Sequence, residues 1–215
     1  MSLFDIFRKP GVPQAKPPTY PLGLRMKAGV EIDGLPFRLA ADRLVFEPPL
    51  GAQFVERIGR IRLSEGATEI FRFYLTDDAF LQVIQSAGVV EAIGYFVFHE
   101  TITPDNAAAF RAWTEPGSRI GAPMFALGDR SYERQWGEDP GRWSPPIAMD
   151  EVVFGADPSR PEFDLTHYAM LYARDADTPS GREHLLVSAE DYGPNEFCVV
   201  VSVGVPLTQA DLRIT

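Results

Sequence analysis

The chain has 215 residues, of which 45% are hydrophobic, 12% aromatic and 23% charged, and its formal net charge is −10. This composition is typical of a globular protein and argues against disorder throughout, and a chain of this length can bury a substantial core. The longest apolar runs are far shorter than the roughly 20 residues that a membrane helix needs, so no such helix is predicted.

The acidic charge is unevenly distributed along the chain. Residues 1–27 hold five basic residues against Asp5, a net of +4, which leaves −14 on the remaining 188 residues. An acidic body repels phosphate, so nucleic acid is not expected as a partner. The chain starts without a signal-peptide pattern, and its single cysteine excludes an internal disulfide, so we expect a cytoplasmic protein. The sequence leaves the oligomeric state open.

Residues 1–21 are predicted to form a short amphipathic segment followed by a linker. Large apolar residues at helical spacing are followed directly by two basic residues: Leu3, Phe4, Phe7, Arg8 and Lys9. Five prolines between residues 10 and 21 favour an extended linker. The segment suits an anchor that weakly contacts an anionic membrane surface or binds a partner's groove. The alternative is that it folds back onto the protein's own core.

Residues 22–215 are predicted to form a single domain of the α+β class, predominantly β, with antiparallel sheets. Asp33-Gly34 is a strong turn signal and predicts a hairpin within residues 31–40. Alternation of apolar and polar residues predicts half-buried strands further on. The expected strands are 70–75, 80–85, 95–102, 124–127, 130–136, 152–154, 163–172, 185–189 and 197–205, the last of them a central strand.

One main helix is predicted near residues 104–113. Thr103 suits the N-cap and Pro104 the first helical position, and an alanine-rich run follows. Loose similarities on either side of this helix suggest that two β-rich halves, 22–103 and 118–215, arose by duplication. The alternative is that any two strand-turn-strand stretches share such features.

Several stretches of the chain resemble the YjfK-like family of bacterial proteins. They are RFYLTDDAFLQV at residues 72–83, YERQW at 132–136, REHLLVSAEDYG at 182–193 and the opening MSLFD. The resemblance covers most of the chain. No activity is established for this family, so the resemblance implies no catalytic residue. Genes of the family tend to lie beside those of phage-shock-like membrane-stress proteins, which implies a link to envelope stress by association alone.

No motif for phosphate binding, dinucleotide binding or a serine nucleophile is present. The stretch GAQFVERIG at residues 51–59 lacks the lysine and the spacing of a phosphate loop. His99, His167 and His184 are far apart in the sequence, so no metal site is predicted. His167 is interpreted as a hydrogen-bonded core histidine. No cofactor and no catalytic residue are expected.

Three further features are explained more simply by local structure than by metal binding or catalysis. Residues 175–181 resemble a calcium loop only superficially and are interpreted as a polar hairpin connection. Asp77 and Asp78 are expected to end a strand rather than to form a carboxylate pair. Cys198 lies in a valine-rich strand and is expected to be an inert buried thiol.

A long exposed loop is predicted at residues 137–146, and aromatic residues flank it. Together with an arginine they form a candidate interaction surface: Tyr132, Arg134, Trp136 and Trp143. The alternative is that they cover the edge of the core.

These features favour a non-enzymatic binding or adaptor protein that acts with a membrane-associated protein partner. It is expected in the cytoplasm or at the periphery of the inner membrane. Two alternatives stay open. A β-rich small-ligand binder requires a cavity with few polar groups, and an enzyme with an unrecognised site requires ionisable groups that converge in a cleft.

Overall fold

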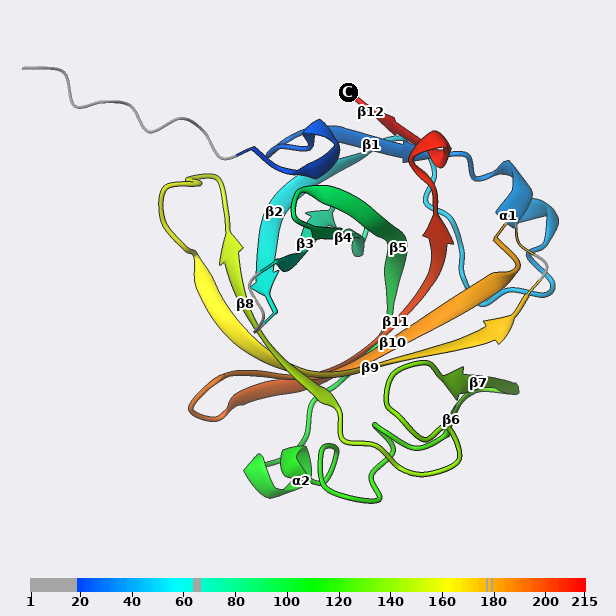
Figure 1. The fold of residues 1–215 in the computed structure, drawn as a ribbon, viewed down its shortest axis with the longest axis vertical. Helices are drawn as coiled ribbons and strands as arrows, with labels where there is room; N and C mark the ends of the chain where they lie inside the picture. The colour runs from blue at the N-terminus through cyan, green and yellow to red at the C-terminus, as the bar shows by residue number, and fades with distance from the viewer. Residues whose placement is uncertain (1–18, 64–66, 177, 179) are drawn as a thin grey trace, which may run out of the picture.

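In the computed structural model, which describes residues 19–63, 67–176, 178 and 180–215, the chain forms an eight-stranded antiparallel β-barrel with additional strands (Figure 1). The first half of the barrel is a meander of β2 (Gln53–Arg62), β3 (Thr68–Leu75), β4 (Ala79–Ser86) and β5 (Val89–Ile102). The second half is a meander of β8 (Ile147–Phe154), β9 (Phe163–Asp175), β10 (Arg182–Gly193) and β11 (Glu196–Leu207). Pairing of β5 with β11 and of β2 with β8 closes the barrel.

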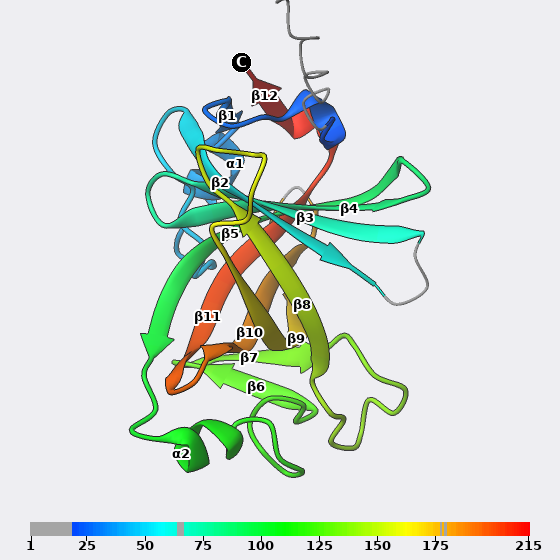
Figure 2. The same cartoon turned by 90° about the vertical axis from the view of Figure 1, so that its left-hand side faces the viewer.

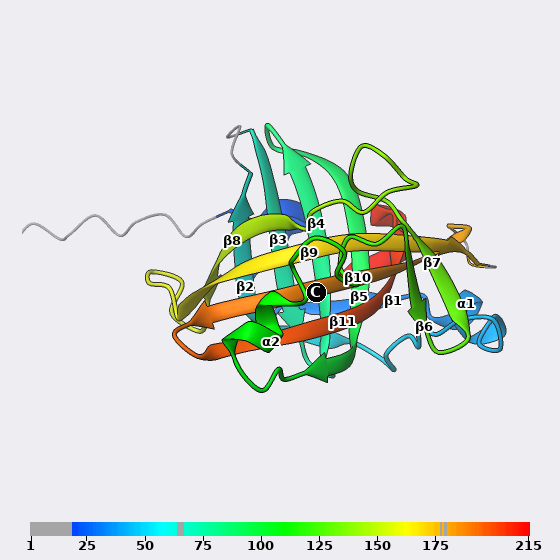
Figure 3. The same cartoon turned by 90° about the horizontal axis from the view of Figure 1, so that it is seen from below.

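Short elements cover the barrel on two opposite sides (Figures 1 and 2). On one side lie η2 (Pro21–Gly23), β1 (Gly29–Ile32), α1 (Leu35–Leu39), η3 (Gln209–Asp211) and β12 (Leu212–Ile214). On the other side lie α2 (Ala107–Arg111), β6 (Met124–Leu127) and β7 (Arg130–Arg134), which Figure 3 shows over the second meander. Among the described elements, no helix is long and apolar enough to cross a membrane.

The larger apolar core lies outside the barrel wall, beneath these covering elements. On β3, the outward residues Phe71 and Phe73 belong to this core, and the ring of Tyr20 packs edge-on against both at 5.9 and 6.1 Å. On the opposite side, the covering segment contributes Phe110 from α2 and Phe125 from β6. Because successive residues of a strand point to opposite faces, the other set of residues on each barrel strand points into the barrel.

Most of the predicted strands are confirmed, and 197–205 is indeed central, since β11 lies between β5 and β10. Residues 175 and 182 pair across the β9–β10 connection, as a hairpin requires. Asp77 and Asp78 form the β3–β4 turn, both with positive φ. Strand β2 was not predicted. It overlaps the stretch GAQFVERIG at residues 51–59, and a bulge between Val55 and Arg57 interrupts its alternation.

Two predictions of local structure were wrong in part. The main helix is a single turn, α2, capped by Asn106, whose side chain accepts hydrogen bonds from the amides of Ala108 and Ala109. The turn signal at Asp33-Gly34 leads into α1 rather than into a hairpin. Its Pro36 lies in the first turn of the helix, where a missing N–H costs nothing.

The predicted halves 22–103 and 118–215 are not separate bodies. Each contributes one meander, and the two meanders close a single barrel through β5–β11 and β2–β8. Their origin by duplication stays a prediction, and so does the domain boundary near Pro21.

Candidate functional site

The barrel is shaped like a cup, with a floor of apolar side chains at one end. Inward apolar residues form a separate small cluster, and two of them, Phe80 and Leu186, also line the cavity above it. The members of the cluster are Ile61, Ile70, Phe80, Phe96, Met149, Ala169 and Leu186. The cavity described below is lined by Leu75, Asp78 and Ala79, so it lies toward the end of the barrel where the β3–β4 turn lies.

A layer of buried charged side chains lies above the floor. The side chains of Arg72 on β3, Glu151 on β8 and His167 on β9 are 4%, 0% and 1% exposed. Two donors converge on Glu151 Oε2, Arg72 Nη1 at 3.2 Å and His167 Nε2 at 2.5 Å. The hydroxyl of Tyr74 donates to both carboxylate oxygens at 2.9 and 3.0 Å, and Arg72 Nε donates to Gln82 Oε1 at 3.0 Å. Such a network stays buried only because every charge has partners.

The second nitrogen of His167 links this layer to the open part of the cup. His167 Nδ1 lies 3.0 Å from Ser188 Oγ and 3.4 Å from Glu190 Oε1. The hydroxyl of Tyr192 donates to Glu190 Oε2 at 2.7 Å. A chain of contacts therefore runs from Glu151, through the imidazole, to a carboxylate at the mouth.

The contacts of the layer shift the pKa values of its members. Burial and the charge of Arg72 lower the pKa of His167, but hydrogen bonds to Glu151 and Glu190 outweigh them and raise it above 6.5. Burial raises the pKa of Glu151, but the charge of Arg72 and the hydrogen bonds from His167 and Tyr74 hold it below 4.5. These contacts favour the ionised carboxylate of Glu151 and the protonated imidazole of His167, beside the guanidinium of Arg72.

Gly59 on β2 makes the room that this layer needs. It faces Arg72 across the β2–β3 pair and Val153 across the β2–β8 pair. A Cβ atom at this position would lie 1.5 Å from Glu151 Oε1 and 2.6 Å from its carboxyl carbon. The absence of a side chain at residue 59 is therefore a condition for the buried carboxylate of Glu151.

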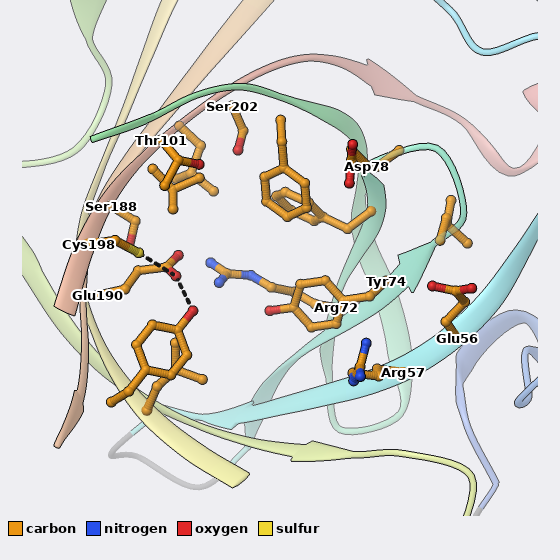
Figure 4. A pocket seen from close by; sticks show the side chains of 18 of the residues that line it. Glu56, Arg57, Arg72, Tyr74, Asp78, Thr101, Ser188, Glu190, Cys198 and Ser202 are labelled. Carbon is orange, nitrogen blue, oxygen red and sulfur yellow. Dashed lines mark hydrogen bonds between the residues drawn. The ribbon is translucent and has the colours of Figure 1, made fainter. Parts of the chain in front are cut away.

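A cavity of about 380 Å³ opens above the charged layer. This is within the usual range for small-molecule sites. Figure 4 shows the side chain of Arg72 extending into its middle, toward Glu190, with Ser202 and Thr101 on the adjoining wall. The rings of Phe163 and Tyr192, both 36% exposed, lie 6.0 Å apart among the lining residues.

Cys198, the single cysteine of the chain, lines this cavity. Its Sγ lies 3.9 Å from Glu190 Oε2. Burial and the neighbouring negative charge of Glu190 raise the pKa of the thiol to about 11. The side chain is thus a protonated thiol, in agreement with an inert role, but it is only partly buried.

The predicted interaction residues do not gather at the cavity. Leu3, Phe4, Phe7, Arg8 and Lys9 lie outside the described residues. The other four predicted interaction residues lie on β7 and in the segment that follows it: Tyr132, Arg134, Trp136 and Trp143.

Two of these four residues are buried in structural contacts. Tyr132 donates to the buried Glu183 at 2.8 Å, and Arg134 donates to the backbone carbonyls of Trp136, Asp139 and Arg142. Arg134 thereby fixes the loop at 137–146, whose Trp143 donates to the carbonyl of Ile120 at 3.1 Å. Trp136 and Trp143 are half-buried, so contact with a partner at this surface would fall to them. That role stays a prediction.

Sequence reasoning missed most of the cavity. The described residues contain no group of three or more His, Cys, Asp or Glu side chains arranged to hold a metal. His167 is a hydrogen-bonded buried histidine, as predicted, but its partners were not foreseen because they come from three other strands, β3, β8 and β10. His99 is exposed and His184 half-buried.

Comparison with known proteins identifies the family but no activity. Residues 4–213 match the family described as "Protein of unknown function (DUF2491)". The chain belongs to this family. It is also 28% identical, over 222 residues, to "Uncharacterized protein YjfK" of Escherichia coli (strain K12), with 99% of this chain and 96% of that protein covered. The resemblance read from the sequence is thus confirmed. No solved structure matches the chain.

Proposed function

We propose that this protein binds a small molecule in the cup of its barrel. The observation that carries the proposal is a cavity of about 380 Å³ that reaches the buried guanidinium of Arg72 and is lined by both polar and apolar side chains. Eight-stranded barrels have an interior just wide enough to be filled by side chains or to hold one small ligand. Here the floor is filled, and the space above it is lined by groups that can form hydrogen bonds.

An acyl-transfer enzyme is a weaker interpretation of the same residues. Ser188, His167 and Glu151 are linked by hydrogen bonds, as in sites that activate a serine nucleophile. A nucleophilic serine requires a neutral imidazole that can accept its proton. Burial and Arg72 lower the pKa of His167, but hydrogen bonds to Glu151 and Glu190 outweigh them and raise it, which favours the protonated imidazole over the neutral base. The chain of contacts therefore fits a fixed polar lining better than an activated nucleophile.

The adaptor role expected from the sequence stays a separate proposal. It rests on residues 1–20, almost all of which lie outside the described residues. A membrane-associated partner, a peripheral location and a link to envelope stress depend on that segment and on family association. Ligand binding in the cup is compatible with such a role.

Blocking the mouth of the cup tests the proposed function. Thr101 is exposed and lines the cavity, whereas Thr103 is exposed two residues further along and does not line it. Small fragments of about 10–20 non-hydrogen atoms are screened by ligand-observed NMR against the wild type, Thr101→Trp and Thr103→Trp. We expect fragments that bind the wild type and Thr103→Trp but are lost with Thr101→Trp. Binding to all three alike, or no binding to the wild type, would overturn the proposal.

A further inference from the structure

The buried charged side chains beside the cavity pair with one another. Arg72 and His167 face Glu151 and Glu190, and each cation lies within reach of a carboxylate: Arg72 Nη1 is 3.2 Å from Glu151, and His167 Nδ1 is 3.4 Å from Glu190. The rim adds Arg57 and two carboxylates, Glu56 and Asp78, but all three are exposed, so solvent screens their charges. A charged ligand would bring a further charge into this desolvated layer without a counter-charge, which is costly. The balance therefore favours a ligand with no net charge.

Arg72 offers one terminal nitrogen, Nη2, with its two N–H groups, to the cavity. Its Nε donates to Gln82 and its Nη1 to Glu151, while Nη2 has no hydrogen-bond partner among the described residues. In the described residues, three polar side-chain atoms are fully buried without a hydrogen-bond partner, and Nη2 is not one of them. Nη2 therefore retains contact with the cavity. A guanidinium nitrogen is a donor only, so the ligand needs an acceptor at this point.

Glu190 offers hydrogen-bond acceptors to the same cavity, facing Arg72 (Figure 4). Its oxygens receive Tyr192 OH at 2.7 Å and lie 3.4 Å from His167 Nδ1 and 3.9 Å from Cys198 Sγ. Two carboxylate oxygens provide about four acceptor positions, so at least one is left for a ligand donor. Arg72 and Glu190 thus present a donor beside an acceptor.

An aromatic wall completes the cavity. Phe80 and Phe98 both line it, with ring centroids 5.4 Å apart, and Leu186 and Val200 adjoin them. Such a wall accepts a flat apolar body.

We infer that the cup selects an uncharged, largely planar molecule with an amide-type edge, whose carbonyl accepts from Arg72 Nη2 and whose N–H donates to Glu190. The inference rests on the proposed function and names the ligand class of the same site.

Three probes of nearly the same shape separate this class from its alternatives: benzamide, benzoate and benzamidine. Benzamide is neutral and has both an acceptor and a donor, benzoate is an anion with acceptors only, and benzamidine is a cation with donors only. Their affinities for the full-length protein are measured by NMR titration at millimolar concentrations. We expect benzamide to bind about tenfold more tightly than either charged probe, and Thr101→Trp to abolish its binding.

A variant of Glu190 shows whether the charge balance sets this preference. Glu190→Gln keeps the shape of the side chain and removes one negative charge from the cavity. We expect benzoate to gain about tenfold relative to benzamide, and the exposed Glu196→Gln, on the neighbouring strand, to leave the order unchanged.

The outcomes separate the two proposals. If benzoate or benzamidine binds best to the wild type, or if only other fragments bind and Thr101→Trp abolishes their binding, the ligand class is wrong and the proposed function stands. If no probe or fragment shows binding that depends on Thr101, both are wrong.

Discussion

Replacing Gly59 by alanine should disrupt the charged layer of the barrel. The new Cβ would lie 1.5 Å from Glu151 Oε1, so the carboxylate has to move. If the Cβ met the end of a flexible side chain at the surface, that side chain could move into solvent at little cost in stability. Glu151 is fully buried, however, and is held by Arg72, His167 and Tyr74. The substitution therefore removes a carboxylate from its partners rather than shifting it into solvent.

The expected magnitude follows from that displacement. Breaking a buried ion pair by removing one partner costs about 3–5 kcal/mol. For a chain of this length, 1 kcal/mol shifts Tm by about 2–4 °C, so Gly59→Ala should lower Tm by roughly 6–20 °C. Gly141→Ala is the matched control, because its φ is not in the left-handed region and its Cβ would meet only Asp139 Oδ1, at 3.5 Å. It should change Tm by no more than about 1 °C.

A double-mutant cycle tests the cause of the effect. The nearest atoms to the added Cβ all belong to the Glu151 side chain. In a Glu151→Ala background, Gly59→Ala should therefore add less than about 0.5 kcal/mol, measured by urea unfolding. The reasoning is refuted if Gly59→Ala is as mild as Gly141→Ala, or if its full cost persists in the Glu151→Ala background.

Three further predictions concern other parts of the molecule. Glu183→Ala leaves the amides of Val45 and Phe46 without their acceptor and should lower the free energy of unfolding by about 3 kcal/mol or more. Amide hydrogen exchange should become faster first at residues 43–46, and a uniform increase over the whole chain would contradict a local role of Glu183. Because the pKa of His167 is raised in the folded state, its contribution to stability is complete below pH 6.5 and is lost as the pH rises through the folded-state pKa. His167→Gln should remove this decline of the unfolding free energy at higher pH. An unchanged pH profile would contradict the prediction. Deletion of residues 1–18, which keeps Tyr20 and its contacts with Phe71 and Phe73, should leave Tm unchanged and abolish binding to anionic vesicles. A Tm several degrees lower, together with an intact protein that ignores vesicles, would show that the segment packs on the body.

Most of the strands could be predicted from the sequence because they carry a strong alternating pattern, whereas β2, which a bulge interrupts, could not. β3 is an example of the pattern, with Phe71 and Phe73 on one face and Arg72 and Tyr74 on the other. The helices could not be predicted as well, since their ends depend on local capping. Asn106 begins α2 three residues after the expected N-cap, and Pro36 supports α1 where Asp33-Gly34 suggested a hairpin.

The site was harder to predict because its members are far apart in the chain. Arg72 meets Glu151 across 79 residues and His167 across 95. A bulge adds to the difficulty, because it lets both Phe98 and Thr101 pair with inward residues of β11, three positions apart. No spacing rule within one strand brings these side chains together.

The polar faces of the strands were also open to a wrong interpretation. Alternation normally indicates an apolar face on the core and a polar face in water. In this barrel the apolar outer face is covered by the flanking elements, and the polar face of β3 points inward. Gly59 is the residue that reconciles the two, because an inward glycine opposite Arg72 provides the space in which a buried carboxylate can meet the guanidinium. The requirement for glycine at residue 59 therefore follows from the volume of the neighbouring side chains rather than from their hydrophobicity.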